Sequence, residues 1–222
     1  MKIIVGNKAY SSWSLRGWLA LKLSGLPFEE EVVSLYDDAW PARRAQPDVA
    51  PSAGRVPILW DGDVAVWESL AIIDYLADKV GQDRFWPADG AARGFARSIA
   101  SEMHAGFADL RRECPTVFRR TFPPRPVSAE VQANVDRIVH LWSEALTRFG
   151  GGSGNGGFLF GDFSAADIMY APVTTRFTTY SLPVPDFAAD YCRRVQTHPF
   201  VKEWMDAAHR ESWVIEKFEQ PE

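Results

Sequence analysis

The beginning of the chain carries a strand–helix–strand pattern that strongly restricts its fold. A short apolar run at 3–5 is followed by apolar residues at Leu15, Trp18, Leu19 and Leu23, the spacing of an amphipathic helix. Gly25 and Pro27 then end this helix, and residues 28–36 read as a second strand. Such a unit favours parallel pairing of its two strands through a right-handed crossover.

A hairpin and a second helix follow. Strands are predicted at 58–60 and 64–67, and Asp61-Gly62 between them is a strong signal for a two-residue turn. A helix begins after Glu68-Ser69. Residues 1–80 are therefore predicted to form a small α/β domain with the order βαβ and then ββα.

The remainder of the chain is predicted to be helical. The turn-rich stretch 81–90 reads as a linker, and 91–222 as an all-helical domain. Within that domain we expect one long helix over 91–113, a second over 128–149 and three further helices. Four prolines exclude a helix over 114–127, and "GGGSGNGG" at 150–157 predicts a flexible surface connection. Before the hairpin, the polar stretch 37–55 is long for a loop, and long loops are often functional.

Composition excludes several functional classes. The net charge of -5 and the lack of a Lys/Arg run argue against nucleic-acid binding. Cys114 and Cys192 are too far apart for a CxxC pair or a cysteine-rich zinc site, so no metal is expected. The start "MKIIVGNKAY" is too short and polar for a signal peptide, and no apolar run reaches the ~20 residues of a membrane span. We expect a cytoplasmic protein without membrane contact.

Three motifs carry a resemblance to a known family. They are "SSWSLRGWLALKLSG" from Ser11, "RVPILWDGDVAVWESLAIIDYLAD" from Arg55 and "GDFSAADIMYAPV" from Gly161. In this order and spacing, the chain resembles the cytosolic glutathione transferases, and within them the serine-type, zeta-like bacterial members. The resemblance implies a thioredoxin-like domain that binds glutathione, a helical domain that forms the electrophile pocket, and a homodimer.

The resemblance also implies how glutathione is held. Val56 would pair its backbone with the cysteinyl unit, as an added strand does, and Pro57 would follow a cis peptide bond. Ser69, at a helix N-terminus that attracts anions, would bind the γ-glutamyl carboxylate, and Glu68 would accept from the γ-glutamyl ammonium. Trp40, in the long loop, would approach the glycyl end.

The serines near the first helix have a predicted chemical role. A thiol attacks electrophiles as the thiolate, and a hydroxyl that donates to the sulfur favours this charged form. By the resemblance Ser11 is that donor, and Ser12 supplies a second one. Ser14 either caps the helix or faces the core, and Tyr10 is an alternative donor. The zeta form has cysteine where this chain has Trp13, which removes a side-chain donor.

Five further residues are candidates, and four of them have two alternative roles. Arg16 either neutralises a glutathione carboxylate or supports the helix. Met103 and Phe107 share a helix face and either line the electrophile pocket or belong to the core, and His104 either polarises a leaving group or is structural. Arg176 precedes Phe177, and in zeta members an Arg-Phe pair in this region holds a substrate carboxylate. Here the pair follows the helix proline at a shorter spacing.

The predicted function is conjugation of glutathione to a small hydrophobic electrophile. Glutathione-dependent isomerisation or peroxide reduction on the same fold is an alternative, and so is a non-catalytic scaffold protein. The retained Val56-Pro57, Glu68-Ser69 and serine motifs favour an enzyme. Ser164 and Asp167 form an S-x-x-D capping box, which predicts a structural role.

Overall fold

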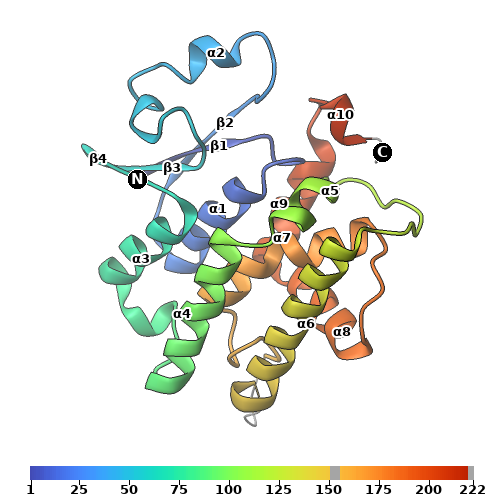
Figure 1. The fold of residues 1–222 in the computed structure, drawn as a ribbon. Helices are drawn as coiled ribbons and strands as arrows, with labels where there is room; N and C mark the ends of the chain where they lie inside the picture. Colours follow the sequence, from blue (N-terminus) through green and yellow to red (C-terminus); the bar gives the residue numbers. More distant parts are fainter. Residues whose placement is uncertain (151–155, 220–222) are drawn as a thin grey trace.

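The N-terminal part of the chain is built on one mixed sheet (Figure 1). The structure is a computed structural model that describes residues 1–150 and 156–219. The strands are β1 (Lys2–Gly6), β2 (Glu29–Val33), β3 (Ile58–Asp61) and β4 (Val64–Trp67), in the sheet order β2-β1-β3-β4. Strands β1 and β2 pair in parallel, and the other pairs are antiparallel, which confirms the crossover and the hairpin at Asp61-Gly62.

Alternate residues of the central strands enter two separate cores, as the two-residue period of a strand requires. Ile3, Val5 and Leu59 pack with the helices α1 (Ser12–Ser24) and α3 (Ser69–Val80) in the large core. Ile4 and Ile58 face a second, smaller core. The segment 34–57 covers that side of the sheet, and it contains the short helices α2 (Trp40–Arg43) and η1 (Ala50–Ser52).

Helix α1 is buried more completely than its sequence pattern predicts. Ser11 caps its N-terminus, and Gly25, with φ of 73°, ends it in the left-handed conformation that glycine adopts without strain. The polar side chains Ser12, Ser14 and Arg16 are buried as well as the apolar ones. The cause is position, because α1 contacts α3, α7 (Ala165–Thr179) and α9 (Pro199–Arg210) as well as the sheet.

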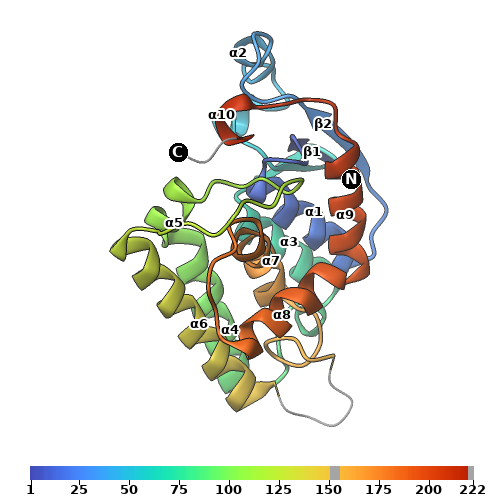
Figure 2. The ribbon, with the colours of Figure 1, turned by 90° about the vertical axis from the view of Figure 1, so that its right-hand side faces the viewer.

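The C-terminal part is helical, as predicted, with one error (Figures 1 and 2). The remaining elements are η2 (Gln82–Arg84), α4 (Gly90–Ala105), α5 (Ala108–Glu113), α6 (Ala129–Phe149), α8 (Asp186–Thr197) and α10 (Glu216–Glu219). The single helix expected over 91–113 is wrong, because the chain breaks at Gly106 and Phe107 adopts a left-handed φ of 59°. Arg111 stabilises the break by donating from Nε to the Gly106 carbonyl at 3.0 Å.

The capping box of α7 is confirmed. The Asp167 carboxylate accepts from the backbone N–H groups of Leu159 (3.1 Å) and Ser164 (2.9 Å), from the Ser164 hydroxyl (2.8 Å) and from the Tyr191 hydroxyl (2.9 Å). This buried carboxylate therefore joins α7 to α8 and to the turn before α7.

Two further predictions concern the glycine-rich connection and membrane-spanning helices. The glycine-rich connection predicted at 150–157 lies mostly outside the described residues. Among the helices of 1–150 and 156–219, none has both the length and the hydropathy needed to span a bilayer.

Candidate functional site

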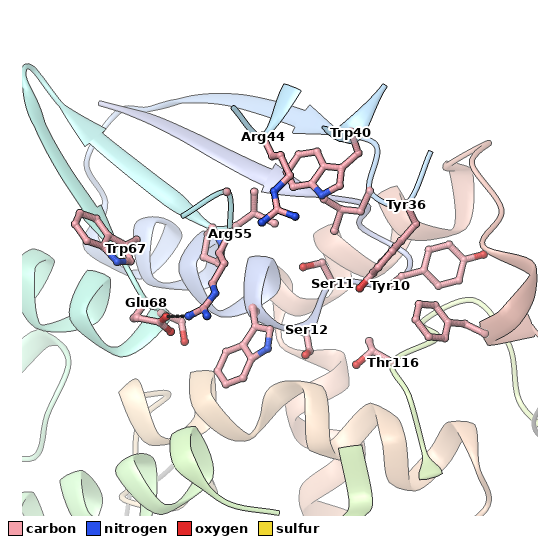
Figure 3. A pocket seen from close by; sticks show the side chains of 17 residues that line it. Tyr10, Ser11, Ser12, Tyr36, Trp40, Arg44, Arg55, Trp67, Glu68 and Thr116 are labelled. Atoms are coloured by element: carbon pink, nitrogen blue, oxygen red, sulfur yellow. Dashed lines mark ion pairs between the residues drawn. The ribbon is translucent and has the colours of Figure 1, made fainter. Parts of the chain in front are cut away.

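A pocket of about 530 Å³ lies where the tip of α1, the 34–57 segment and the start of α3 meet the helical part (Figure 3). This volume is within the ~300–1,000 Å³ of typical ligand pockets. Thr116, from the loop after α5, and Phe218, from α10, complete its wall. Of the predicted site residues, those that line the pocket are Ser11, Ser12, Trp40, Val56, Pro57, Glu68 and Ser69. Those that do not are Arg16, Met103, His104, Phe107 and Arg176.

The Val56-Pro57 turn offers an unpaired stretch of backbone to the pocket. Its peptide bond is cis, and strand pairing begins only at Ile58. None of the described residues forms a hydrogen bond with the Val56 N–H or C=O. Gly17 of α1 packs directly beneath Pro57, since a Cβ at this position would lie 2.8 Å from the Pro57 Cγ. The lack of a side chain at position 17 thus lets the turn pack against the second turn of α1.

The start of α3 is suited to an anion. Glu68 holds the N-cap position with φ of 69° and makes no side-chain cap, so its carboxylate does not occupy the first turn of the helix. Ser69 is the first helical residue and is only 1% exposed. Free N–H groups and the helix dipole attract negative charge at such a terminus. The Glu68 carboxylate lies 3.6 Å from both Arg55 Nη1 and His104 Nε2, and Figure 3 shows the Arg55 pair.

Ser11 and Ser14 form a small hydrogen-bonded group at the tip of α1. The Ser11 hydroxyl donates to Ser14 Oγ at 2.8 Å and accepts from the Ser14 backbone N–H at 3.3 Å. Ser14 Oγ also accepts from the Gly6 backbone N–H at 2.9 Å. Ser14 therefore faces the core, which is one of its two predicted roles, and Ser11 caps the helix.

Ser12 and Thr116 share one partner, the side chain of Arg176. Arg176 Nη2 lies 2.6 Å from Thr116 Oγ1 and 3.4 Å from Ser12 Oγ, and Nε donates to the Cys114 carbonyl at 3.0 Å. Arg176 is buried and stands behind the pocket wall. Burial lowers the pKa of its guanidinium to about 9, so it remains charged at neutral pH.

Arg16 supports the wall from the core side. It is fully buried, and its Nε donates to the Met169 carbonyl of α7 at 2.9 Å. Its guanidinium carbon lies 4.7 Å from the ring centre of Trp13, and that of Arg111 lies 4.6 Å from the same ring. Trp13 faces the pocket, so two cations hold this aromatic side chain in place.

The other predicted electrophile residues, on α4 and just after it, do not line the pocket. Met103 ends up in the core, and Phe107, beyond the end of α4, is also buried. His104 contacts the Trp13 ring at 5.3 Å between centroids, in an edge-on arrangement. Partial burial lowers the pKa of His104, which favours its neutral form at pH 7.

Several lining residues were not predicted from the sequence. Arg44 and Arg55 come from the loop around Trp40, and Figure 3 shows both projecting into the pocket. Two arginines near a tryptophan in a long loop could have been used to predict an anion-binding site from the sequence. Tyr36 and Phe218 show no local sequence pattern that would have placed them in a pocket.

The tail of the described chain closes one side of the pocket. Phe218 lies 6.0 Å from the Tyr10 ring and 5.9 Å from the Tyr36 ring, measured between centroids. The neighbouring Glu219 carboxylate accepts from Arg119 Nε at 2.9 Å, from Arg120 and from the Tyr10 hydroxyl. Glu219 therefore fixes α10 against the start of the chain.

Comparison with known proteins agrees with this architecture. The family model for the glutathione S-transferase N-terminal domain matches residues 10–79, and that for the C-terminal domain matches 125–207. A glutathione transferase homolog from Burkholderia, solved with bound glutathione, superposes with a TM-score of 0.69 over 95% of this chain and 98% of the other, at 21% identity. The zeta-class maleyl pyruvate isomerase, a bacterial protein, gives a TM-score of 0.67 over 96% and 100%, at 18% identity.

The curated relatives each match only part of this chain. A dichloromethane dehalogenase from Methylorubrum extorquens is 40% identical over 32% of this chain and 22% of its own length. Protein IN2-1 from Zea mays is 26% identical over 77% and 63%. A probable maleylacetoacetate isomerase from Vibrio cholerae is 30% identical over 47% and 50%. The chain thus spans less than two thirds of each of these relatives.

The N-terminal and C-terminal domain models match this chain in that order. The fold of the chain also agrees with that of the solved glutathione transferase homolog. The chain belongs to the glutathione S-transferase family.

Proposed function

We propose that this protein is a glutathione transferase that binds glutathione in the pocket, activates its thiol as thiolate and conjugates it to a small hydrophobic electrophile. One observation carries the proposal. The pocket is lined by an unpaired backbone at Val56, a helix start at Ser69 that suits an anion and a hydroxyl-bearing helix tip at Ser11-Ser12. These are three groups that an extended tripeptide with a central thiol would need.

The residues present fit the ends of glutathione. The γ-glutamyl carboxylate suits the start of α3 with the Ser69 hydroxyl, and the ammonium beside it suits the Glu68 carboxylate. The Val56 backbone can pair with the cysteinyl unit. Arg44 and Trp40 lie on the opposite side of the pocket from Glu68, as Figure 3 shows, and they suit the glycyl carboxylate.

The chemistry needs a shifted thiol pKa and close contact with the electrophile. A free cysteinyl thiol has a pKa of ~8.5, and a shift of two units corresponds to ~2.7 kcal/mol. Hydroxyl donors at the tip of α1 favour the thiolate. The sulfur then forms a bond to the electrophilic carbon, and the leaving group departs with the bonding electron pair. Holding the two reactants together supplies the rest of the acceleration.

The electrophile side of the pocket is aromatic. Tyr10, Trp13, Tyr36 and Phe218 line it, and Thr116 adds a hydroxyl. This wall suits a small apolar or aromatic substrate.

The proposal is tested by calorimetry with glutathione and by conjugation assays with a panel of halogenated aromatic and alkyl substrates. Ser69→Ala should weaken glutathione binding about tenfold, the effect of losing a hydrogen bond to a charged group of ~1.5 kcal/mol or more. Ser98→Ala, at an exposed serine of α4 outside the pocket, is the matched control and should bind normally. A folded wild-type protein that binds no glutathione would support the scaffold alternative instead.

Glutathione-dependent isomerisation is a second candidate. It is favoured by the guanidinium of Arg176 behind the pocket hydroxyls, a suitable counter-charge for an acidic substrate, and by the likeness to the two isomerases described above. Isomerisation regenerates glutathione, whereas conjugation consumes it. Measuring free thiol during turnover distinguishes the two reactions.

The proposal also covers the oligomeric state, the location and the biological role of the enzyme. We propose a cytoplasmic homodimer with a detoxifying role that requires no metal ion. The exposed Val64 and Trp67 of the edge strand β4 are 45% and 42% exposed and offer apolar surface for a partner subunit. Light scattering coupled to gel filtration would give the oligomeric state.

A further inference from the structure

The hydroxyl of Ser11 already has an acceptor within the protein. It donates to Ser14 Oγ, and it accepts from the Ser14 backbone N–H. Ser14 Oγ in turn accepts from Gly6, so the hydrogen bond between the two serines is part of a chain that reaches the core of the sheet. A serine has one hydroxyl proton. Ser11 would have to break this bond before it could donate to a ligand in the pocket.

The hydroxyls of Ser12 and Thr116 are arranged in the opposite way. Both receive a hydrogen bond from Arg176 Nη2, whose two protons are sufficient for the two contacts. A guanidinium donates and never accepts, so each of these oxygens is the acceptor and keeps its own proton for another partner. No described residue accepts a hydrogen bond from either hydroxyl, and both side chains line the pocket.

Resting on the proposed function, we propose that Ser12 and Thr116 are the two hydroxyl donors to the thiolate, and that Arg176 is the positioning residue that orients both. Ser12 comes from the tip of α1, and Thr116 comes from the loop after α5. Figure 3 shows the two side chains next to each other on the same side of the pocket. The thiol proton leaves to solvent, and both hydroxyls keep theirs, so neither residue acts as a base.

The charges around Arg176 support this arrangement. The ionisable groups that face it are Arg111 on α5, Tyr180 at the end of α7 and the Cys114 thiol, and Arg16 lies close enough to interact with it. None of the described carboxylates forms an ion pair with Arg176. Its Nη1 is buried without a hydrogen-bond partner in the described chain. The positive charge behind the two hydroxyls is therefore uncompensated and favours an anion in front of them.

The test is the pKa of the thiol in the glutathione complex, followed by the ultraviolet absorbance of the thiolate. Ser12→Ala and Thr116→Val should each raise this pKa by about one unit, the size of one hydrogen bond to a charged acceptor. Ser11→Ala should lower thermal stability through loss of the cap and raise the thiol pKa by less than either Ser12→Ala or Thr116→Val does. Ser24→Ala and Thr174→Val remove buried hydroxyls elsewhere on α1 and α7 and serve as matched controls.

Arg176→Lys tests the positioning role. It keeps the charge but loses the planar fork, so we expect a raised thiol pKa and a smaller further effect of Ser12→Ala in the double variant than in the wild type. The Ser12 and Thr116 variants decide the proposal even if this variant does not fold.

The outcomes separate this proposal from the proposed function. If glutathione binds and only Ser11→Ala raises the thiol pKa, the assignment to Ser12 and Thr116 is wrong, while the transferase proposal stands. If the wild-type protein binds no glutathione, both are overturned. Glutathione affinities measured by calorimetry below the thiol pKa of every complex should be equal, whereas above it Ser12→Ala and Thr116→Val should bind about tenfold more weakly than the wild type, because affinity and thiol pKa are linked. Unequal affinities of the protonated form would show that these variants disturb the binding site itself and would contradict the assignment.

Discussion

Replacing Gly17 by alanine tests whether α1 sets the position of the Val56-Pro57 turn, which we propose to bind glutathione. An added Cβ would lie 2.8 Å from Pro57 Cγ and 3.0 Å from Pro57 Cβ. Ordinary carbon–carbon contacts lie at ~3.5–4.0 Å, so the turn or the helix has to move by roughly 0.7 Å. Overpacking of this kind costs ~1–3 kcal/mol, which in a protein of this size lowers Tm by roughly 2–12 °C.

The functional part of this prediction concerns the backbone of Val56. A displaced turn no longer presents its N–H and C=O at hydrogen-bonding distance, so glutathione should bind about tenfold more weakly, as a loss of ~1.4 kcal/mol implies. Differential scanning calorimetry gives Tm, and titration calorimetry gives Kd. Gly94→Ala, in the middle of α4, is the control, because a Cβ there meets nothing within 4 Å and alanine favours a helix. A Gly17→Ala protein with wild-type Tm and Kd would refute the reasoning.

Three further predictions follow from buried groups and from the proposed chemistry. Asp167→Ala leaves the donors of Leu159, Ser164 and Tyr191 without an acceptor and should lower the free energy of unfolding in urea by roughly 3 kcal/mol or more. Burial raises the pKa of Asp167 to about 6, above its unfolded value of ~3.9. The bound proton therefore stabilises the folded form fully below about pH 4, and this stabilisation is lost as the pH rises through 6. The wild-type protein should show this trend relative to Asp167→Ala, and a difference independent of pH would contradict it. Glu219→Ala releases α10, so a hydrophobic S-substituted glutathione should bind several-fold more weakly while glutathione itself binds normally; equal losses for both ligands would count against α10 as part of the electrophile wall. Dialysis against EDTA should leave conjugation unchanged, and activity restored only by an added divalent metal would disprove a metal-free reaction.

The sheet and the part of the pocket around Val56-Pro57 and Glu68-Ser69 could be predicted from the sequence because local signals determine them. Asp61-Gly62 specifies its turn, and the alternating apolar residues of β1 and β3 specify the two cores. The motif around Val56-Pro57 and Glu68-Ser69 lies in one continuous stretch, so its members are brought together by a hairpin and a helix start.

The electrophile side could not be predicted in the same way. The apolar pattern of 91–113 continues across Gly106, yet the helix ends there, with Phe107 in the left-handed conformation and Arg111 hydrogen-bonded to the Gly106 carbonyl. Thr116 and Phe218 come from irregular or very short segments far apart in the sequence. Their place in the pocket depends on contacts such as that of Glu219 with Arg119, which no local pattern reveals.

The division of the pocket wall between distant segments has a consequence for how such an enzyme changes its substrate. Residues that would bind the tripeptide belong to the sheet, its covering segment and the helices next to it, with Thr116 added from the start of the loop after α5, whereas Phe218 belongs to α10 on the other side. Substitutions after Thr116 in that loop and around α10 can reshape the space for the second reactant without removing the groups that bind the first. A library confined to residues 117–127 and 211–219 would therefore be the economical route to new electrophile preferences.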